Sequence, residues 1–117
     1  MAARLRQARE WRGLSQREVG VRMGLDKDTA SARISRYESG AMSVSLESLF
    51  ELAQALDVPP AFFLSTTEAM ASAILSLGSE SESQQKKLAD VLAALTALPV
   101  KQREELIKRI LPCPKNG

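Results

Sequence analysis

The sequence predicts an all-α protein, and three observations carry this prediction. Apolar residues recur at intervals of three and four along most of the 117-residue chain, which is the spacing of an amphipathic helix. Two segments carry the capping-box pattern that begins many helices, Ser15 with Glu18 and Ser65 with Glu68. Gly24 separates two short helical segments by a gap typical of a tight turn between helices.

An N-terminal helix that carries several arginines is followed by a short helix with Ser15 as its N-cap. Trp11, near the turn between them, is expected to pack in the core or against a helix end. Val19 and Met23 form an apolar i, i+4 stripe, and Gly20 stands where another helix must approach closely. Because glycine inside a helix costs about 1 kcal/mol relative to alanine, Gly20 indicates a crowded contact or a local kink.

A second helix of the pair is predicted over about residues 28–39, with Asp26 or Asp28 as its N-cap. Its core-facing stripe is expected to comprise Ala30, Ile34 and Tyr37. The opposite face carries Asp28, Thr29, Ala32, Ser35 and Arg36. This face combines short polar groups with a cation, whereas the inward stripe is apolar.

Two further segments complete the predicted N-terminal domain, residues 1–64. A helix capped by Ser45 should run to about residue 56, where Asp57 and two prolines end it. Its inward-facing residues are expected to be Leu46, Leu49, Phe50, Ala53 and Leu56. A short apolar turn over residues 61–64 should close the domain, with Phe62 and Phe63 in the core.

Residues 65–117 are expected to form a helical C-terminal extension. The capping pattern at Ser65 leads into a helix with Met70, Ala73, Ile74 and Leu77 on one stripe. A flexible link to Ser83 precedes helices over about residues 84–98 and 100–111, which Pro99 separates. The candidates for dimerisation on these helices are Leu88, Val91, Leu92, Leu95, Leu106, Ile107 and Ile110. Packing onto the chain's own domain, or binding of a different protein, are the alternatives.

The composition offers few groups for catalysis. The chain has no histidine and one cysteine, Cys113, which excludes His/Cys metal sets, Ser-His-Asp triads and Cys-His dyads. We therefore expect neither a metal, a cofactor nor an enzymatic activity. The free thiol and the lack of a signal peptide or membrane-length apolar run suggest a cytoplasmic protein, which in a bacterium includes the nucleoid.

The charge is distributed unevenly. The formal net charge is only +2, but residues 1–40 hold nine Lys and Arg against five acids, and residues 41–64 hold three acids and no base. Cations gathered around two crossing helices favour DNA as a partner. Arginine can bind guanine bidentately and Ser or Thr can contact either base edge, so the polar face of the second helix suits a major groove. The alternative interpretation is an ordinary solvated face.

Five short motifs, taken together and in their order along the chain, favour the DNA-binding interpretation over an ordinary solvated face. They are Arg9, Trp11 to Gln16, Met23-Gly24-Leu25, Ile34 to Gly40 and Leu49 to Pro59. Together they resemble the XRE family, the helix-turn-helix domains similar to lambda repressor and Cro, over about residues 3–64. The resemblance implies a five-helix domain that sets the second motif helix in the major groove, with dimers on near-palindromic operators.

The resemblance also implies roles for individual residues. Gln16 matches the family's phosphate-anchoring glutamine, and Arg9 and Glu38 match a pair that commonly forms an internal salt bridge. The expected phosphate-contacting residues are Gln16, Arg17 and Arg33. The expected base-reading residues are Lys27, Thr29, Ser31, Ala32, Ser35 and Arg36.

The chain departs from the family between Gly24 and Glu38, where it has about four extra residues. Four residues are close to one helical turn, so either the second helix starts one turn early or the turn is an enlarged loop. The resulting hypothesis is a cytoplasmic bacterial or phage regulator, a dimeric repressor that binds double-stranded DNA. The alternative is an antitoxin-like or anti-repressor adaptor whose helical tail binds another protein.

Overall fold

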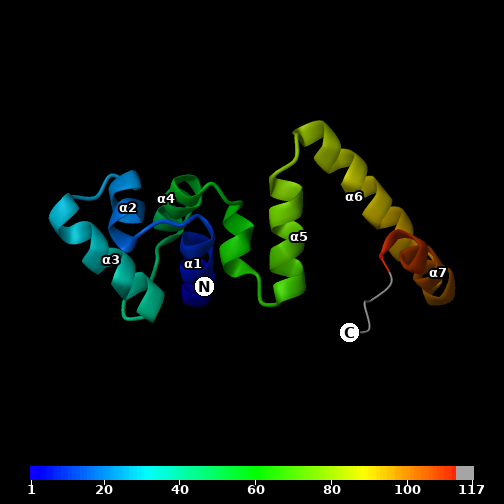
Figure 1. Cartoon of the computed structure of the whole chain (residues 1–117), viewed down its shortest axis with the longest axis horizontal. Coiled ribbons are helices and arrows are strands. Elements are labelled where there is room, and N and C mark those ends of the chain that lie inside the picture. Colours follow the sequence, from blue (N-terminus) through cyan, green and yellow to red (C-terminus); the bar gives the residue numbers. More distant parts are fainter. Residues whose placement is uncertain (113–117) are drawn as a thin grey trace. The chain divides into compact units, whose positions relative to one another are not determined.

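The computed structural model describes residues 1–112 and shows α-helices and one 3₁₀-helix there, with no strand in that range. In chain order these are α1 (Ala2–Trp11), α2 (Gln16–Arg22), α3 (Lys27–Ser39), α4 (Leu46–Leu56), η1 (Pro60–Leu64), α5 (Glu68–Gly78), α6 (Glu82–Ala97) and α7 (Val100–Ile110) (Figure 1). The all-α prediction is therefore confirmed. Cys113, on which the thiol argument rested, lies outside the described residues.

The chain divides into two compact units, Met1–Ser79 and a second unit that begins at Glu80. This division falls later than the boundary expected after residue 64, because α5 packs on the helices before it. Ala71 of α5 is only 1% exposed and belongs to the same buried cluster as η1. Gly78 stands close to the Pro59 ring, where a larger side chain would not fit.

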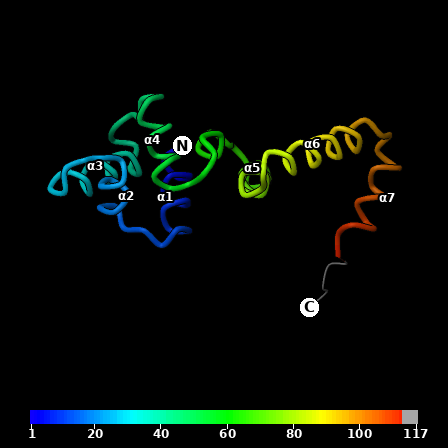
Figure 2. The backbone as a smooth tube through the Cα atoms, turned by 90° about the horizontal axis from the view of Figure 1, so that it is seen from above, coloured from blue at the N-terminus to red at the C-terminus, as the bar shows by residue number. Residues whose placement is uncertain are grey.

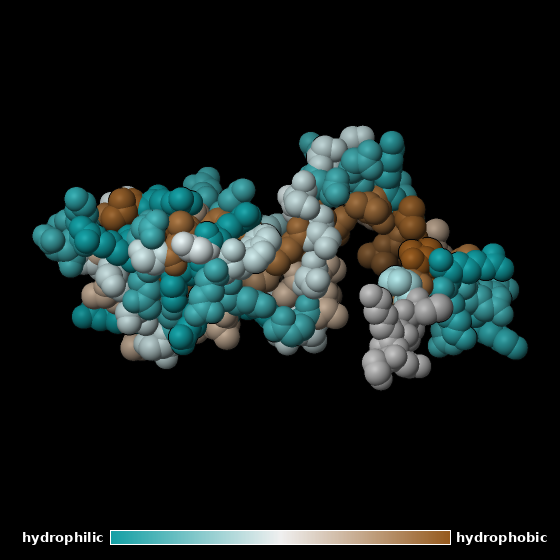
Figure 3. Space-filling view, in the orientation of Figure 1, coloured by the Kyte–Doolittle hydropathy of each residue, from teal (hydrophilic) through white to brown (hydrophobic). Residues whose placement is uncertain are grey.

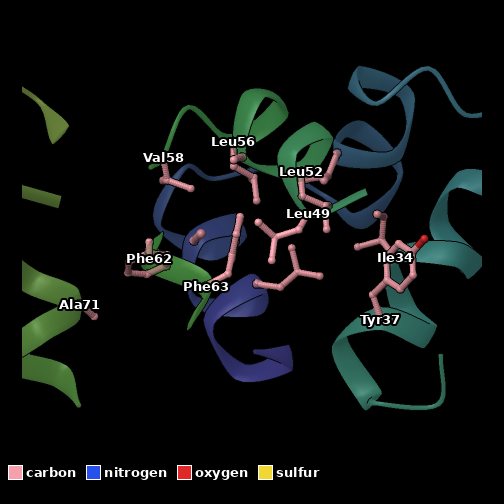
Figure 4. Packing of buried hydrophobic residues seen from close by; sticks show 13 residues of the cluster. Ile34, Tyr37, Leu49, Leu52, Leu56, Val58, Phe62, Phe63 and Ala71 are labelled. Atoms are coloured by element: carbon pink, nitrogen blue, oxygen red, sulfur yellow. The ribbon is translucent and has the colours of Figure 1, made fainter. Parts of the chain in front are cut away.

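The core of the first unit is built mainly from α1, α3, α4 and η1, with Val19 of α2 and Ala71 of α5 added to it. Figure 4 shows its side chains converging from these elements. Ile34 and Tyr37 of α3 are 0% and 4% exposed, as the helical spacing predicted. Phe62 and Phe63 are also buried, with ring centroids 6.0 Å apart in an edge-to-face arrangement. The predicted positions of these four residues are thus confirmed.

The inward face of α4 differs from the prediction. Ser45 caps the helix as expected, by accepting a hydrogen bond from the backbone N–H of Ser48. However, Leu46 and Phe50 are 69% and 52% exposed, so their predicted core positions are wrong. The buried stripe is Leu49, Leu52, Ala53 and Leu56, and Ala55 beside it is buried as well. Both stripes have helical spacing, and packing against η1 and α2 selects the second one.

The start of α5 also differs from the prediction. Thr67, not Ser65, is the N-cap and accepts a hydrogen bond from the N–H of Met70. Glu68 does not complete a capping box, because its carboxylate accepts a hydrogen bond from Arg4 Nη1 at 2.8 Å. Arg4 Nε also donates to the Ser65 carbonyl, at 3.2 Å. In α5, Ala71, Ile74 and Leu75 pack on the core, while Met70 and Ala73 of the predicted stripe are exposed.

Trp11 does not lie in the core, so that part of its prediction is wrong. The side chain is 57% exposed, and the Arg12 guanidinium lies over its ring at 4.3 Å from the centroid. Arg12 in turn donates from Nε to the Leu56 carbonyl at 2.9 Å and from Nη2 to the Asp57 carbonyl at 2.6 Å. The tryptophan therefore covers the arginine that satisfies the C-terminal carbonyls of α4.

The second unit consists of α6 and α7 in the described residues. Ser81 caps α6, and Pro99 separates the two helices as predicted. Arg103 of α7 donates hydrogen bonds to three carbonyls at the end of α6, those of Leu95, Thr96 and Leu98. Neither helix contains a buried residue. Figure 3 shows apolar side chains along one side of α6 and on part of α7.

Candidate nucleic-acid interface

The helices α2 and α3 are the two consecutive helices of one motif, and they lie side by side in both backbone views (Figures 1 and 2). Ser15 caps α2 by accepting a hydrogen bond from the N–H of Glu18, whose carboxylate accepts one from the Ser15 N–H, so the predicted capping box is confirmed. These bonds hold the pKa of Glu18 below its ordinary value. Gly24 has a φ of 91° and turns the chain between the helices.

Gly20 marks the closest approach of α2 to α3. A Cβ atom at this position would stand 2.5 Å from the Ala30 Cβ and 2.8 Å from its Cα. The crowded contact predicted from the glycine is confirmed. Because Gly20 has no side chain, the two backbones approach closely. Packing of Gly20 against Ala30 therefore holds the angle between α2 and α3.

The extra residues before Glu38 lengthen α3 and do not enlarge the turn. Asp26 is the N-cap, and its Oδ1 accepts a hydrogen bond from the Asp28 N–H at 3.4 Å. The helix begins directly afterwards at Lys27 and ends at Ser39, where Gly40 with a φ of 80° terminates it. Of the two possibilities left open by the sequence, the early start is the one observed.

The outer face of α3 is exposed along the whole helix. Every predicted base-reading residue is exposed: Lys27, Thr29, Ser31, Ala32, Ser35 and Arg36. The helical spacing places Ala32 and Ser35 most directly opposite the buried stripe, whereas Lys27 and Ser31 lie toward its flank. The Thr29 hydroxyl donates to the Asp26 carbonyl at 3.3 Å, which leaves its lone pairs free to accept.

Asp28 and Ser39 also lie on this outer face and were not in the predicted base-reading set. Asp28 is exposed in the first turn, and it is free to face outward because Asp26 provides the cap. A carboxylate there can accept a hydrogen bond from the amino group of cytosine and would be repelled by phosphate. Helical spacing had already placed Asp28 on this face from the sequence, where Asp28 was an alternative N-cap; Asp26 is the residue that caps the helix.

A partly buried ion pair ties α1 to the end of α3. Arg9 Nε lies 2.6 Å from Glu38 Oε2, and Arg9 Nη2 donates to Glu38 Oε1 at 3.1 Å. The two side chains are 14% and 6% exposed. The hydrogen bond to Glu38 raises the pKa of the Arg9 guanidinium. The Gln16 amide donates to the same carboxylate at 3.3 Å, so α2 joins this network.

The three residues expected at phosphates lie in different settings. Gln16 is half-buried at the first turn of α2 and is held by Glu38. Arg17 is exposed beside it. Arg33 is half-buried on α3, where its Nη1 lies 3.5 Å from the Tyr37 hydroxyl oxygen. The arrangement offers one preoriented amide and two cations near the N-terminal end of α2 and the flank of α3.

Within residues 1–112 no three His, Cys, Asp or Glu side chains come together in a way that could hold a metal ion. None of the helices in that range has both the length and the apolar content needed to cross a membrane.

A helix-turn-helix family model matches residues 5–63. The solved structures include a match titled as the crystal structure of transcriptional regulator BswR, with a TM-score of 0.76 and 32% sequence identity. The alignment covers 83% of this chain and 96% of that chain. No curated protein matches the sequence significantly.

Proposed function

The chain belongs to the XRE family of helix-turn-helix DNA-binding transcription regulators, and we propose that it is a dimeric repressor that reads an inverted-repeat operator. The observation that carries the proposal is the outer face of α3. Its short polar and cationic side chains are exposed over 13 residues, while Ala30, Ile34 and Tyr37 anchor the helix to the core. A helix of that length extends about 20 Å, which suits a stretch of major groove.

The proposal divides recognition between two groups of residues. Arg17, Gln16 and Arg33 bind phosphates and set the register, without selecting a sequence. The outer face of α3 reads base edges, with Arg36 positioned for a guanine and Ser35 for either base. The extra first turn of α3 adds Thr29 to this surface and Lys27 to its flank, so the proposed contacts extend beyond the usual reading positions.

The second unit supports the dimeric part of the proposal. Its apolar side chains are open, with Val91 and Leu92 of α6 and Ile110 of α7 all more than half exposed. Isolated helices of 11 and 16 residues are marginal in water without a packed apolar face. A second copy of the chain would cover this face and would place two α3 helices on the half-sites of one operator.

The test is selection of DNA duplexes by the full-length protein, followed by affinity measurements on the selected site. The expected result is an inverted repeat whose affinity falls steeply with salt, because bound phosphates release counterions. Arg36→Ala should weaken binding to that site by about 1–3 kcal/mol and relax the preference at one base pair. Arg6→Ala is the matched control, since Arg6 is exposed and pairs with Glu10 on α1.

An Arg36→Ala protein with unchanged affinity and site preference would show that α3 is not oriented as proposed. If no sequence is enriched, DNA reading is not the main role, and the adaptor alternative becomes the better explanation of the exposed tail. Repression is tested separately by transcription from a promoter that overlaps the selected site. Increased transcription there would indicate activation instead.

A further inference from the structure

The carboxylate of Asp28 is an unpaired charge on the outer face of α3. Its side chain is exposed, and Asp26 provides the cap of the helix, so the Asp28 carboxylate is not used for capping. Within residues 1–112 no ion pair includes Asp28. A carboxylate that enters a DNA interface loses water and is repelled by phosphates, so it needs a hydrogen-bond donor from the DNA.

The helical geometry of α3 places Asp28 toward base edges. At about 100° per residue, Asp28 and Ala32 lie about 150–170° from the centre of the buried stripe of α3. When a helix lies in the major groove, residues opposite its buried stripe face the bases, whereas residues at its flanks face the phosphates. Base contacts are made mainly by the N-terminal residues of such a helix, and Asp28 belongs to the first turn.

We infer that Asp28 accepts a hydrogen bond from the amino group of a cytosine and so selects a C·G pair at one position of each half-site. The inference rests on the proposed function and adds a residue to its base-reading set. In the major groove only cytosine N4 and adenine N6 are donors. Adenine also presents its N7 acceptor beside N6, and a carboxylate is repelled by that lone pair. Cytosine offers a donor with no acceptor on the same base edge.

Arg36 carries the opposite charge on the same face, but it does not neutralise Asp28 within the helix. Eight residues separate the two, which corresponds to about 12 Å along the helix axis. Arg36 is exposed, and in the part of the chain that the structure describes it forms no ion pair either. The two side chains therefore address different base pairs, Arg36 a guanine and Asp28 a cytosine.

A favourable charge at the start of the helix is the competing explanation for Asp28, because acids in the first turn stabilise a helix. That role involves no base preference. Under it, removing the Asp28 charge lowers the repulsion from phosphate and strengthens binding to every duplex alike. Under the inference, the same removal changes the preference at one base pair. The two explanations therefore differ in sequence specificity as well as in affinity.

The test compares the full-length wild type with Asp28→Ala and Asp28→Asn on the selected operator and on duplexes that carry each of the four base pairs at each half-site position. The wild type should prefer C·G at one position by roughly fivefold or more. Asp28→Ala should lose that preference. Asp28→Asn should move it toward A·T, because asparagine binds adenine N6 and N7. The preferences at the other positions should not change.

Asp26→Asn is the matched control, because it removes the same charge two residues earlier and asparagine is an equally good N-cap. It should bind all duplexes more tightly and keep every base preference. An Asp28→Ala protein that keeps the wild-type preference for cytosine would overturn the inference, as would an Asp28→Asn protein that differs from the wild type only in overall affinity. A wild type that enriches no sequence would instead overturn the proposed function, and the inference with it.

Discussion

Replacing Gly20 with alanine should push α2 away from α3 and destabilise the first unit. The added Cβ would stand 2.5 Å from the Ala30 Cβ, 2.8 Å from the Ala30 Cα and 2.9 Å from the Ala30 carbonyl oxygen. Carbon atoms in favourable contact are about 3.5–4.0 Å apart, so the helices must separate by about 1 Å. Two of the three atoms belong to the backbone, and no side-chain rotation can relieve the contact.

The size of the effect follows from two opposing contributions. Alanine in place of glycine inside a helix is favourable by about 1 kcal/mol. Overpacking a close contact costs about 1–3 kcal/mol, and a backbone clash belongs at the upper end of that range. The free energy of unfolding should therefore fall by about 2 kcal/mol. For a domain of this size, such a loss lowers Tm by roughly 8–16 °C.

Urea unfolding of the full-length protein, followed by circular dichroism, measures this change. Ala30→Gly removes the atom that makes the shortest contact, so Gly20→Ala/Ala30→Gly should lose less stability than the two single losses added together. A Gly20→Ala protein with a urea midpoint equal to or above that of the wild type would refute the reasoning. The higher helix propensity of alanine would then outweigh its contact with Ala30, and Gly20 would not set the spacing between α2 and α3.

Two further predictions concern ionised groups of the first unit. Glu38→Ala should lower the free energy of unfolding by about 3 kcal/mol in the same urea assay, because Arg9, whose side chain is 14% exposed, loses its partner. A loss below about 1 kcal/mol would contradict this prediction and would mean that water replaces the Glu38 carboxylate. Glu68 has a pKa below its ordinary value of 4.5, mainly through the hydrogen bond from Arg4 and then that from Gln7. The contribution of the ionised Glu68 to stability is therefore present above pH 4.5 and is lost as the pH falls through the lowered pKa of the folded state. Glu68→Gln should flatten the acid side of the stability–pH profile, and an unchanged acid slope would contradict the assigned contact.

The sequence determined those features whose causes are local or that depend on one helix face. The Ser15 capping box involves atoms within four residues, so it could be identified directly from residue types. Gly24 identified the turn because few other residues adopt a positive φ without strain. The buried stripe of α3 and its exposed opposite face followed from helical spacing alone. The candidate DNA-reading surface was predictable for that reason.

The orientation of α4 and the attachment of α5 required the tertiary structure. The α4 sequence contains two overlapping apolar stripes, and only contacts with η1 and α2 bury Leu52 while leaving Phe50 exposed. The contact between Arg4 and Glu68 joins residues 64 positions apart. The Glu68 carboxylate, which the sequence predicted as part of a capping box, is therefore an ion-pair partner of Arg4. Because such contacts depend on the positions of several elements at once, no local pattern in the chain encodes them.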